Sequence, residues 1–274
     1  QYDIVMLPYS FPFGGMENPR LTFANPTLIA GDKSLVQVIA HELAHSWSGN
    51  LVTNATWNDF WLNEGFTVYF ENRIMEEVAG KEIADILAII ERQELDIAIE
   101  SMMESDFPED TQLKLELKKR DPDNGMTDIA YVKGAYFLRT IEQEVGRDKF
   151  DAFLKEYFNV HAFKTITTED FIVYLEENLL DPNNVEFNTH EWIYEPGLPK
   201  NCITINSERL DQMLVLAEKV NHGENIFTGK YKNMKRGDHI TQEWQTFIRT
   251  LSDSITPEEM NRIDAQLKFS TEGN

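Results

Sequence analysis

The chain has 274 residues, of which 42% are apolar and 26% charged, enough to build one large hydrophobic core or two smaller ones. Its formal net charge of −22 argues against nucleic acid and anionic membranes as partners, because like charges repel. A solvated, aggregation-resistant surface explains this charge most simply, and a cold or saline habitat is the alternative.

The first thirty residues are expected to form short strands, because glycine and proline interrupt them repeatedly. From Asp32 the spacing of apolar residues becomes helical, and either Asp32 or Ser34 is predicted to cap this helix. A second helix is predicted from Asn63 to Val78, where Gly80 is expected to end it in a left-handed conformation. A third is predicted from Glu82 to Met103.

A charged, turn-rich segment from Phe107 to Met126 separates these helices from a second helical series. Thr167 is the predicted cap of one helix in that series, and Thr256 begins a capping box in the last. The segment from Pro196 to Pro199 is rigid and is the best candidate for a domain boundary. The helices of this series are predicted at residues 133–145, 147–159, 168–180, 207–221, 241–252 and 257–268.

The single cysteine, Cys202, excludes internal disulfides and is typical of a reducing compartment, so we predict a cytoplasmic protein. A packing role for this thiol is a simpler interpretation than a reactive one. Since the sequence has neither eighteen consecutive apolar residues nor a signal-peptide pattern, we expect no membrane-spanning helix and no membrane partner. It starts at Gln1 in strand-like alternation, so we expect a segment of a longer protein, with a processed amino terminus as the alternative.

The strongest functional pattern is HELAH, from His41 to His45, in the first predicted helix. Histidines four positions apart lie on one helix face, so both imidazoles can reach one zinc ion at about 2.0–2.1 Å. Glu42 lies about 100° around the helix, beside the open side of the metal. There it is expected to accept a proton from water and pass it to the leaving amine. Taken alone, the pattern also fits two histidines on an ordinary helix.

A catalytic zinc ion keeps three protein ligands, and Glu64 is the candidate for the third. It follows His45 by eighteen residues, at the start of the next predicted helix, so two packed helices would bring it to the metal. Glu71 falls on nearly the same helix face and is a candidate acceptor for the free N–H of a ligating histidine, with a surface carboxylate as the alternative. We therefore predict one Zn²⁺ per chain, held by His41, His45 and Glu64.

Five sequence blocks carry a family resemblance over roughly residues 1–200: GGMENP (Gly14–Pro19), HELAHSWSGNLVTN (His41–Asn54), FWLNEG (Phe60–Gly65), AYVKG (Ala130–Gly134) and WIYEPGLP (Trp192–Pro199). In this order they resemble the zinc aminopeptidases of the gluzincin family. Within that family, the chain is most similar to the leukotriene hydrolase and aminopeptidase B subgroup.

The resemblance implies residue roles that spacing alone does not. Glu17 would bind the free α-amino group of a substrate, so that one residue is measured off before the scissile bond. Gly14, Gly15 and Met16 would complete this substrate-binding loop, since glycine lets the backbone approach the peptide closely. Tyr131 would donate its hydroxyl to the tetrahedral oxyanion. Without the family, a solvated loop glutamate and a packed tyrosine are the ordinary alternatives.

Asp123 aligns with an aspartate that the leukotriene hydrolases use in handling substrate, and a plain turn residue is an equal alternative. Phe13, Met16 and Met126 are candidates for an apolar pocket around the first substrate side chain, or for core packing. The leukotriene hydrolases have a tyrosine at the position of Met126 and an aromatic hydroxyl at that of Phe13. Their lipid epoxide also needs a basic anchor from a carboxy-terminal domain, so we expect peptide hydrolysis rather than epoxide hydrolysis.

The resemblance also implies an architecture. Residues 1–200 are expected to form a thermolysin-like zinc metallopeptidase domain of the α+β class, mostly α-helical. Residues 201–274 are expected to form a linker and the start of an all-α carboxy-terminal domain. The family's amino-terminal β domain is expected to be absent from this sequence, so the missing domains would be partners within the same polypeptide.

The leading interpretation is a zinc-dependent aminopeptidase that acts on peptides with a free amino terminus, with Glu42 as general base. A bifunctional aminopeptidase and lipid epoxide hydrolase is the alternative among enzymes. A non-catalytic binding protein that kept the fold, or a folded but poorly active fragment, is the alternative from other classes.

Overall fold

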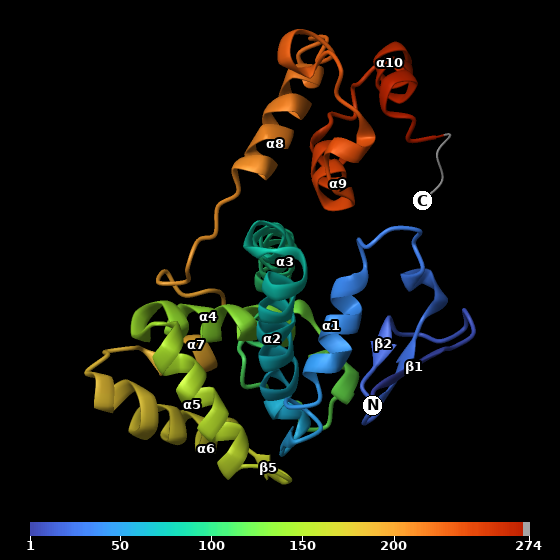
Figure 1. Cartoon of the computed structure of the whole chain (residues 1–274). Coiled ribbons are helices and arrows are strands. Elements are labelled where there is room, and N and C mark those ends of the chain that lie inside the picture. The colour runs from blue at the N-terminus through green and yellow to red at the C-terminus, as the bar shows by residue number, and fades with distance from the viewer. Residues whose placement is uncertain (271–274) are drawn as a thin grey trace.

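A computed structural model describes residues 1–270 and confirms a mostly helical fold of the α+β class. The two largest hydrophobic clusters divide the described chain into a larger unit, which carries α1 to α7, and a smaller one built from α8 to α10 (Figure 1). A third, small cluster of Ala40, Met75, Ala84 and Leu87 packs α1, α2 and α3 together. Among residues 1–270, no helix combines the length and apolar character that crossing a bilayer requires. The α-helices are α1 (Val36–Ala44), α2 (Trp61–Ala79), α3 (Lys81–Met103), α4 (Gly134–Val145), α5 (Arg147–Val160), α6 (Thr168–Leu175), α7 (Thr189–Tyr194), α8 (Glu208–Asn221), α9 (Thr241–Thr250) and α10 (Pro257–Leu267).

The expected strands near the amino terminus form a small sheet beside α1. Its order is β1 (Asp3–Met6), β3 (Leu21–Ala24) and β2 (Gly15–Met16), with β1 parallel and β2 antiparallel to β3. A second sheet was not predicted: β4 (Val52–Asn54) pairs in parallel with β5 (Lys164–Ile166). Three-residue strands are too short for a clear alternating pattern, so their pairing depends on the packing around them.

The predicted cap of the first helix is wrong. The helix begins at Val36 and no side chain caps it. Asp32 instead accepts the backbone N–H of Ser34 at 2.8 Å, because a short acidic side chain readily closes a turn on its own backbone. At the end of α2, Gly80 has the expected positive φ of 90°, but its ψ of 155° is extended rather than left-handed helical.

A close helix crossing places α2 against the segment before α4. A Cβ on Gly65 would lie 2.8 Å from Gly134 Cα, and one on Gly134 would lie 2.9 Å from Gly65 Cα. Only two glycines allow this approach, and it brings the π-helix Ile129–Lys133 next to the start of α2. The sequence predicts a helix here only from residue 133, because a single five-residue π-turn is too short to show a periodicity of its own.

Trp61 anchors the first turn of α2 in the aromatic core of the larger unit. Its ring is fully buried and contacts Phe137 and Phe171 edge-on, at centroid distances of 5.5 and 5.6 Å. Each such pair adds about 0.5–1.5 kcal/mol beyond the burial of its area. The indole N–H donates to Thr168 Oγ1 at 3.1 Å. The beginning of α2 is therefore held rigidly.

The core of the larger unit continues past the predicted break at 196–199. Leu198, Cys202, Ile203 and Ile205 still pack against it, and the second core is formed from Met213 onward. The change of core therefore falls close to the start of α8, about ten residues later than the proline-rich break.

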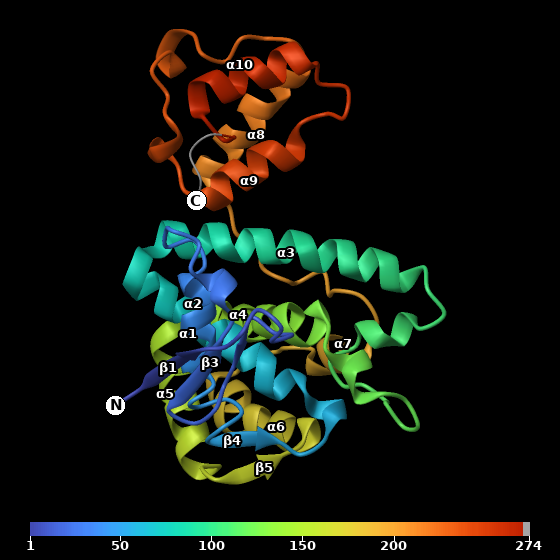
Figure 2. The same ribbon diagram turned by 90° about the vertical axis from the view of Figure 1, so that its right-hand side faces the viewer.

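The smaller unit lies against α3, which runs between the two cores (Figure 2). Polar contacts tie it to the larger unit: Thr241 donates to Asp32 at 2.7 Å, and Arg209 pairs with Glu82 at 3.2 Å. In α10 the predicted capping box is confirmed, with Thr256 as cap and Glu259 as its partner.

Candidate metal centre

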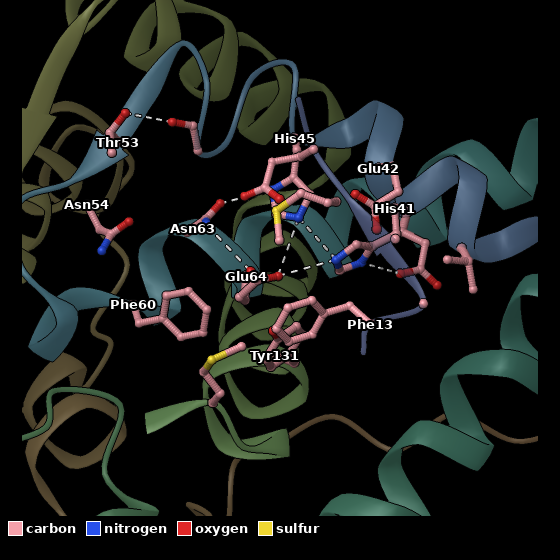
Figure 3. Close-up of a pocket in the computed structure, with 18 of the residues that line it drawn as sticks. Phe13, His41, Glu42, His45, Thr53, Asn54, Phe60, Asn63, Glu64 and Tyr131 are labelled. Carbon is pink, nitrogen blue, oxygen red and sulfur yellow. Dashed lines mark hydrogen bonds and ion pairs between the residues drawn. The ribbon is translucent and has the colours of Figure 1, made fainter. Parts of the chain in front are cut away.

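Two neighbouring helices bring three ligand-type side chains to one point. His41 and His45 lie on α1, and Glu64 lies in the first turn of α2. The imidazole Nε2 atoms are 3.1 Å apart, and Glu64 Oε2 lies 3.3 Å from that of His41 and 3.5 Å from that of His45 (Figure 3). Ligands about 2.05 Å from a tetrahedral zinc ion are separated by roughly 3.3 Å. The triangle therefore has the size that zinc requires.

The opposite nitrogen of each imidazole is held by acceptors. His41 Nδ1 lies 2.9 Å from Glu71 Oε2, and the Glu71 side chain is buried. His45 Nδ1 lies 3.0 Å from Ser48 O and 3.0 Å from Asn63 Oδ1. A ring that donates from Nδ1 to these acceptors keeps its Nε2 lone pair for a metal ion, and the two Nε2 atoms lie next to each other.

The charge around this point favours a cation. Glu64 Oε2 is buried and receives no hydrogen bond from the described residues. Burial alone would lower the pKa of His41, but the carboxylates of Glu64 and Glu71 more than offset it and raise that pKa well above its ordinary value. Four glutamates and no lysine or arginine belong to the described residues that line the pocket. A divalent cation would bind this oxygen, which lacks a hydrogen bond, together with both imidazoles, so the residues fit zinc.

Glu42 lies beside the three ligand-type residues without belonging to them. Its side chain is buried, and its Oε2 has no hydrogen-bond partner among the described residues. Burial raises the pKa of Glu42 to about 7; His41 opposes this shift, and Glu17 and Glu64 add to it. A carboxylate with a pKa near neutrality suits an acid–base role. Gly15 faces it, and a Cβ there would overlap the carboxyl group.

Glu17 lines the same pocket and directly follows β2. One carboxylate oxygen each of Glu17 and Glu42 and a ring nitrogen of His45 lie within 4.8 Å of one another. The predicted loop Gly14–Glu17 lines the same pocket. The structure thus places a further carboxyl group, that of Glu17, close to Glu42 and to the candidate metal ligand His45.

Tyr131 reaches the pocket from the π-helix. Its ring lies nearly parallel to that of His41 with centroids 6.1 Å apart, and the edge of Phe60 contacts it at 5.9 Å. Burial, with further contributions from Glu64 and Glu17, raises the pKa of the phenol well above its ordinary value. The hydroxyl is therefore a neutral donor at every physiological pH.

These groups share a pocket of about 700 Å³. Phe13, Met16 and Met126 line it, as the apolar-pocket hypothesis requires, together with Trp57 and Phe60. Asp123 does not: it is exposed in the turn Pro122–Gly125, outside the residues that line the pocket. Its surroundings fit the alternative hypothesis of a plain turn residue, since its backbone N–H and C=O take part in the hydrogen bonds of the turn.

Two residues that orient His45 were missed in the sequence. Asn63 and Thr67 lie one helical turn apart on α2, and Thr67 Oγ1 also lies 3.0 Å from His45 Nδ1. They are four residues apart and therefore lie on the helix face that carries Glu71. This spacing was the one sign in the sequence that they could face the histidines. A polar pair of this kind is common on exposed helices, however, and only burial shows that it points inward.

Known proteins resemble this chain in sequence and in fold. Residues 1–192 match the family model described as Peptidase family M1 domain. Over 225 residues the chain is 44% identical to leucine aminopeptidase 2-1 of Meyerozyma guilliermondii, covering 81% of this chain and 36% of that protein. It is 41% identical over 226 residues to a leukotriene A-4 hydrolase homolog of Botryotinia fuckeliana, covering 80% and 34%. Native leukotriene A4 hydrolase from Saccharomyces cerevisiae has a similar structure, with a TM-score of 0.85, 33% identity, and coverage of 98% and 46%. The chain thus spans about a third of the length of these curated relatives.

Proposed function

This chain belongs to peptidase family M1, and on that premise we propose that it is the catalytic region of a zinc-dependent aminopeptidase. The proposed reaction is hydrolysis of the first peptide bond of peptides with a free amino terminus. The observation that carries the proposal is the position of Glu17, whose carboxylate lies within 4.8 Å of atoms of both Glu42 and His45. An endopeptidase site has no use for an anion there, whereas an aminopeptidase needs a partner for an ammonium group.

When bound, zinc supplies a Lewis acid that polarises the scissile carbonyl and lowers the pKa of water. His41, His45 and Glu64 would hold it, with His41 supported by Glu71. Glu42 Oε2 is the proton acceptor: it takes a proton from the attacking water and delivers it to the leaving amine. Burial raises the pKa of this carboxyl group above its ordinary value, which favours its holding the proton between the two transfers.

Glu17 and Tyr131 act on opposite ends of the first residue. The Glu17 carboxylate pairs with the substrate ammonium, which fixes the first peptide bond beside Glu42. The Tyr131 hydroxyl donates to the oxygen that becomes negative in the transition state, where a neutral donor costs no reorganisation. The apolar wall around Met126 and Phe60 receives the first side chain, so we propose a preference for apolar amino-terminal residues.

The complete protein provides more than these residues. Since the chain spans about a third of its curated relatives, further domains of the same polypeptide are proposed to complete the substrate path. A cytoplasmic location is also proposed, on the ground that the sequence contains one cysteine. Lipid epoxide hydrolysis, suggested by the names of the Botryotinia fuckeliana and Saccharomyces cerevisiae relatives, stays a separate hypothesis.

The test uses the full-length protein loaded with zinc, leucine p-nitroanilide and its N-acetylated form. The free-amine substrate should be cleaved and the acetylated one should not, since acetylation removes the charge that Glu17 binds. Glu42→Gln should keep its zinc and lose roughly two to four orders of magnitude in kcat, because the proton acceptor is gone while the ligands remain. Equal cleavage of both substrates, or an active Glu42→Gln variant, would overturn the proposal.

A further inference from the structure

Asn50 connects the two halves of the proposed site. It lies in the turn between α1 and β4, and its side-chain N–H donates to the backbone carbonyl of Glu17 at 2.8 Å. Its own backbone N–H donates to the carbonyl of His45 at 3.1 Å. One residue therefore spans from a candidate metal ligand to the amine-binding glutamate, thirty-three positions away in the sequence.

The turn that carries Asn50 has little freedom to move. Gly49, directly before it, has a φ of 102°, a value that a residue with a side chain rarely adopts. A Cβ at Gly49 would also overlap Asn63 Oδ1, the acceptor that orients His45. The Gly49 N–H donates to Val52 O at 2.8 Å, which closes the turn. The turn next to His45 therefore fixes the position of Asn50.

On its own side, Glu17 lies in a short turn, which the Asn18 N–H closes by donating to Met16 O at 3.0 Å. It follows β2, which has only the two residues Gly15 and Met16 and pairs with β3 through them. The ladder therefore ends before Glu17, and the amide of Asn50 anchors its backbone on the pocket side. Without that anchor, the carboxylate would depend on a loop at the end of a two-residue strand.

We propose that Asn50 is a positioning residue that sets the separation between the Glu17 carboxylate and the metal-binding histidines. Because that separation determines how far the free amine lies from the scissile bond, Asn50 selects for removal of a single residue. The inference rests on the proposed function, since it assumes that Glu17 binds the substrate ammonium. Asn50 touches neither the ammonium nor the reacting atoms and acts through the backbone of Glu17.

Two hydroxamates that differ only in the α-amine provide the test. Leucine hydroxamate and 4-methylpentanoyl hydroxamate have the same metal-binding group and the same side chain, but only the first carries an ammonium group. Their dissociation constants would be measured by calorimetry on the zinc-loaded full-length protein, with zinc content determined for each variant. Asn50→Leu should lower the affinity for leucine hydroxamate about tenfold relative to that for the des-amino compound. This is the lower end of the range expected when a charge-assisted contact is lost.

Four further variants make the result interpretable. Asn50→Asp keeps the side-chain size, lacks the N–H donors and should give the same change in ratio, which covers a failure of the leucine variant to fold. Asn178→Leu is the matched control, because the exposed amide of Asn178 donates to a backbone carbonyl, that of Tyr174, at 2.9 Å. Glu17→Gln should lose the preference for the free amine, and adding Asn50→Leu to it should cause no further change in the ratio.

The outcomes separate the two proposals. If Glu17→Gln leaves the ratio unchanged, the proposed function fails. If Glu17→Gln abolishes the preference and both Asn50 variants keep it, the inference about Asn50 alone is wrong. If the Asn50 variants weaken both hydroxamates equally, Asn50 has a general structural role and the inference is likewise overturned.

Discussion

Removing the carboxylate of Glu71 should weaken zinc binding without removing a ligand. Glu71 Oε2 lies 2.9 Å from His41 Nδ1 in a buried setting, so this contact is a charge-assisted hydrogen bond that contributes about 1.5–3 kcal/mol. Losing a partner of a ligating histidine typically lowers metal affinity by about 10–100-fold. Glu71→Gln keeps an acceptor oxygen and loses the charge, so about tenfold is expected; Glu71→Leu loses both, so about a hundredfold is expected.

The assay is competition for zinc with a chromophoric chelator at fixed pH, after circular dichroism has confirmed that each variant is folded. Glu77→Gln is the matched control, since Glu77 lies on the same helix with an exposed side chain. A zinc affinity of Glu71→Leu within twofold of that of Glu77→Gln would refute the reasoning. The order of the two Glu71 variants is a second check, because loss of packing alone would not make leucine worse than glutamine.

Two further predictions concern the π-helix Ile129–Lys133. Tyr131→Phe should lower kcat about a hundredfold with little change in KM, since the hydroxyl donates only in the transition state; steady-state kinetics in which only KM changes would contradict this. Lys133 is fully buried and donates to Thr111 O at 2.7 Å, and burial lowers its pKa to about 7. The unfolded chain then binds more protons between pH 7 and about pH 10, so the free energy of unfolding should rise with pH across that window. Urea unfolding would measure the free energy of unfolding of the parent and of Lys133→Met, whose side chain does not titrate. Between pH 7 and 9.5 the parent should gain about 3 kcal/mol relative to the variant. The same pH dependence in both proteins would contradict a lowered pKa of Lys133.

Much of the helical framework was predictable because its signals are local. The cap of α6 by Thr167 and the capping box of α10 at Thr256 depend on side chains three residues apart, and both were predicted from the sequence. The first helix shows the limit of this reasoning. Asp32 and Ser34 were equally good caps by type, but they bond each other in a turn, and α1 begins after them.

The chemistry of the site was also present in the sequence. Helical geometry alone places His41 and His45 on one face, the spacing of eighteen residues predicts Glu64 as a third ligand, and the family resemblance implies the roles of Glu17 and Tyr131. What they do not show is which atoms are left without partners, since that depends on every neighbour of each group. That Glu64 Oε2 is buried without a hydrogen bond from the described residues is visible only in three dimensions.

The sequence alone therefore determined the ligand types, their helical spacing and most helix ends, because each depends on residues within a few positions of one another. Only the tertiary structure decided the contacts between distant segments. It joined Asn50 to Glu17, brought Gly65 against Gly134, and left Asp123 outside the pocket. The physical reason is that such contacts form when whole helices pack, so their geometry follows from the buried surfaces of the entire unit and not from any short stretch of chain.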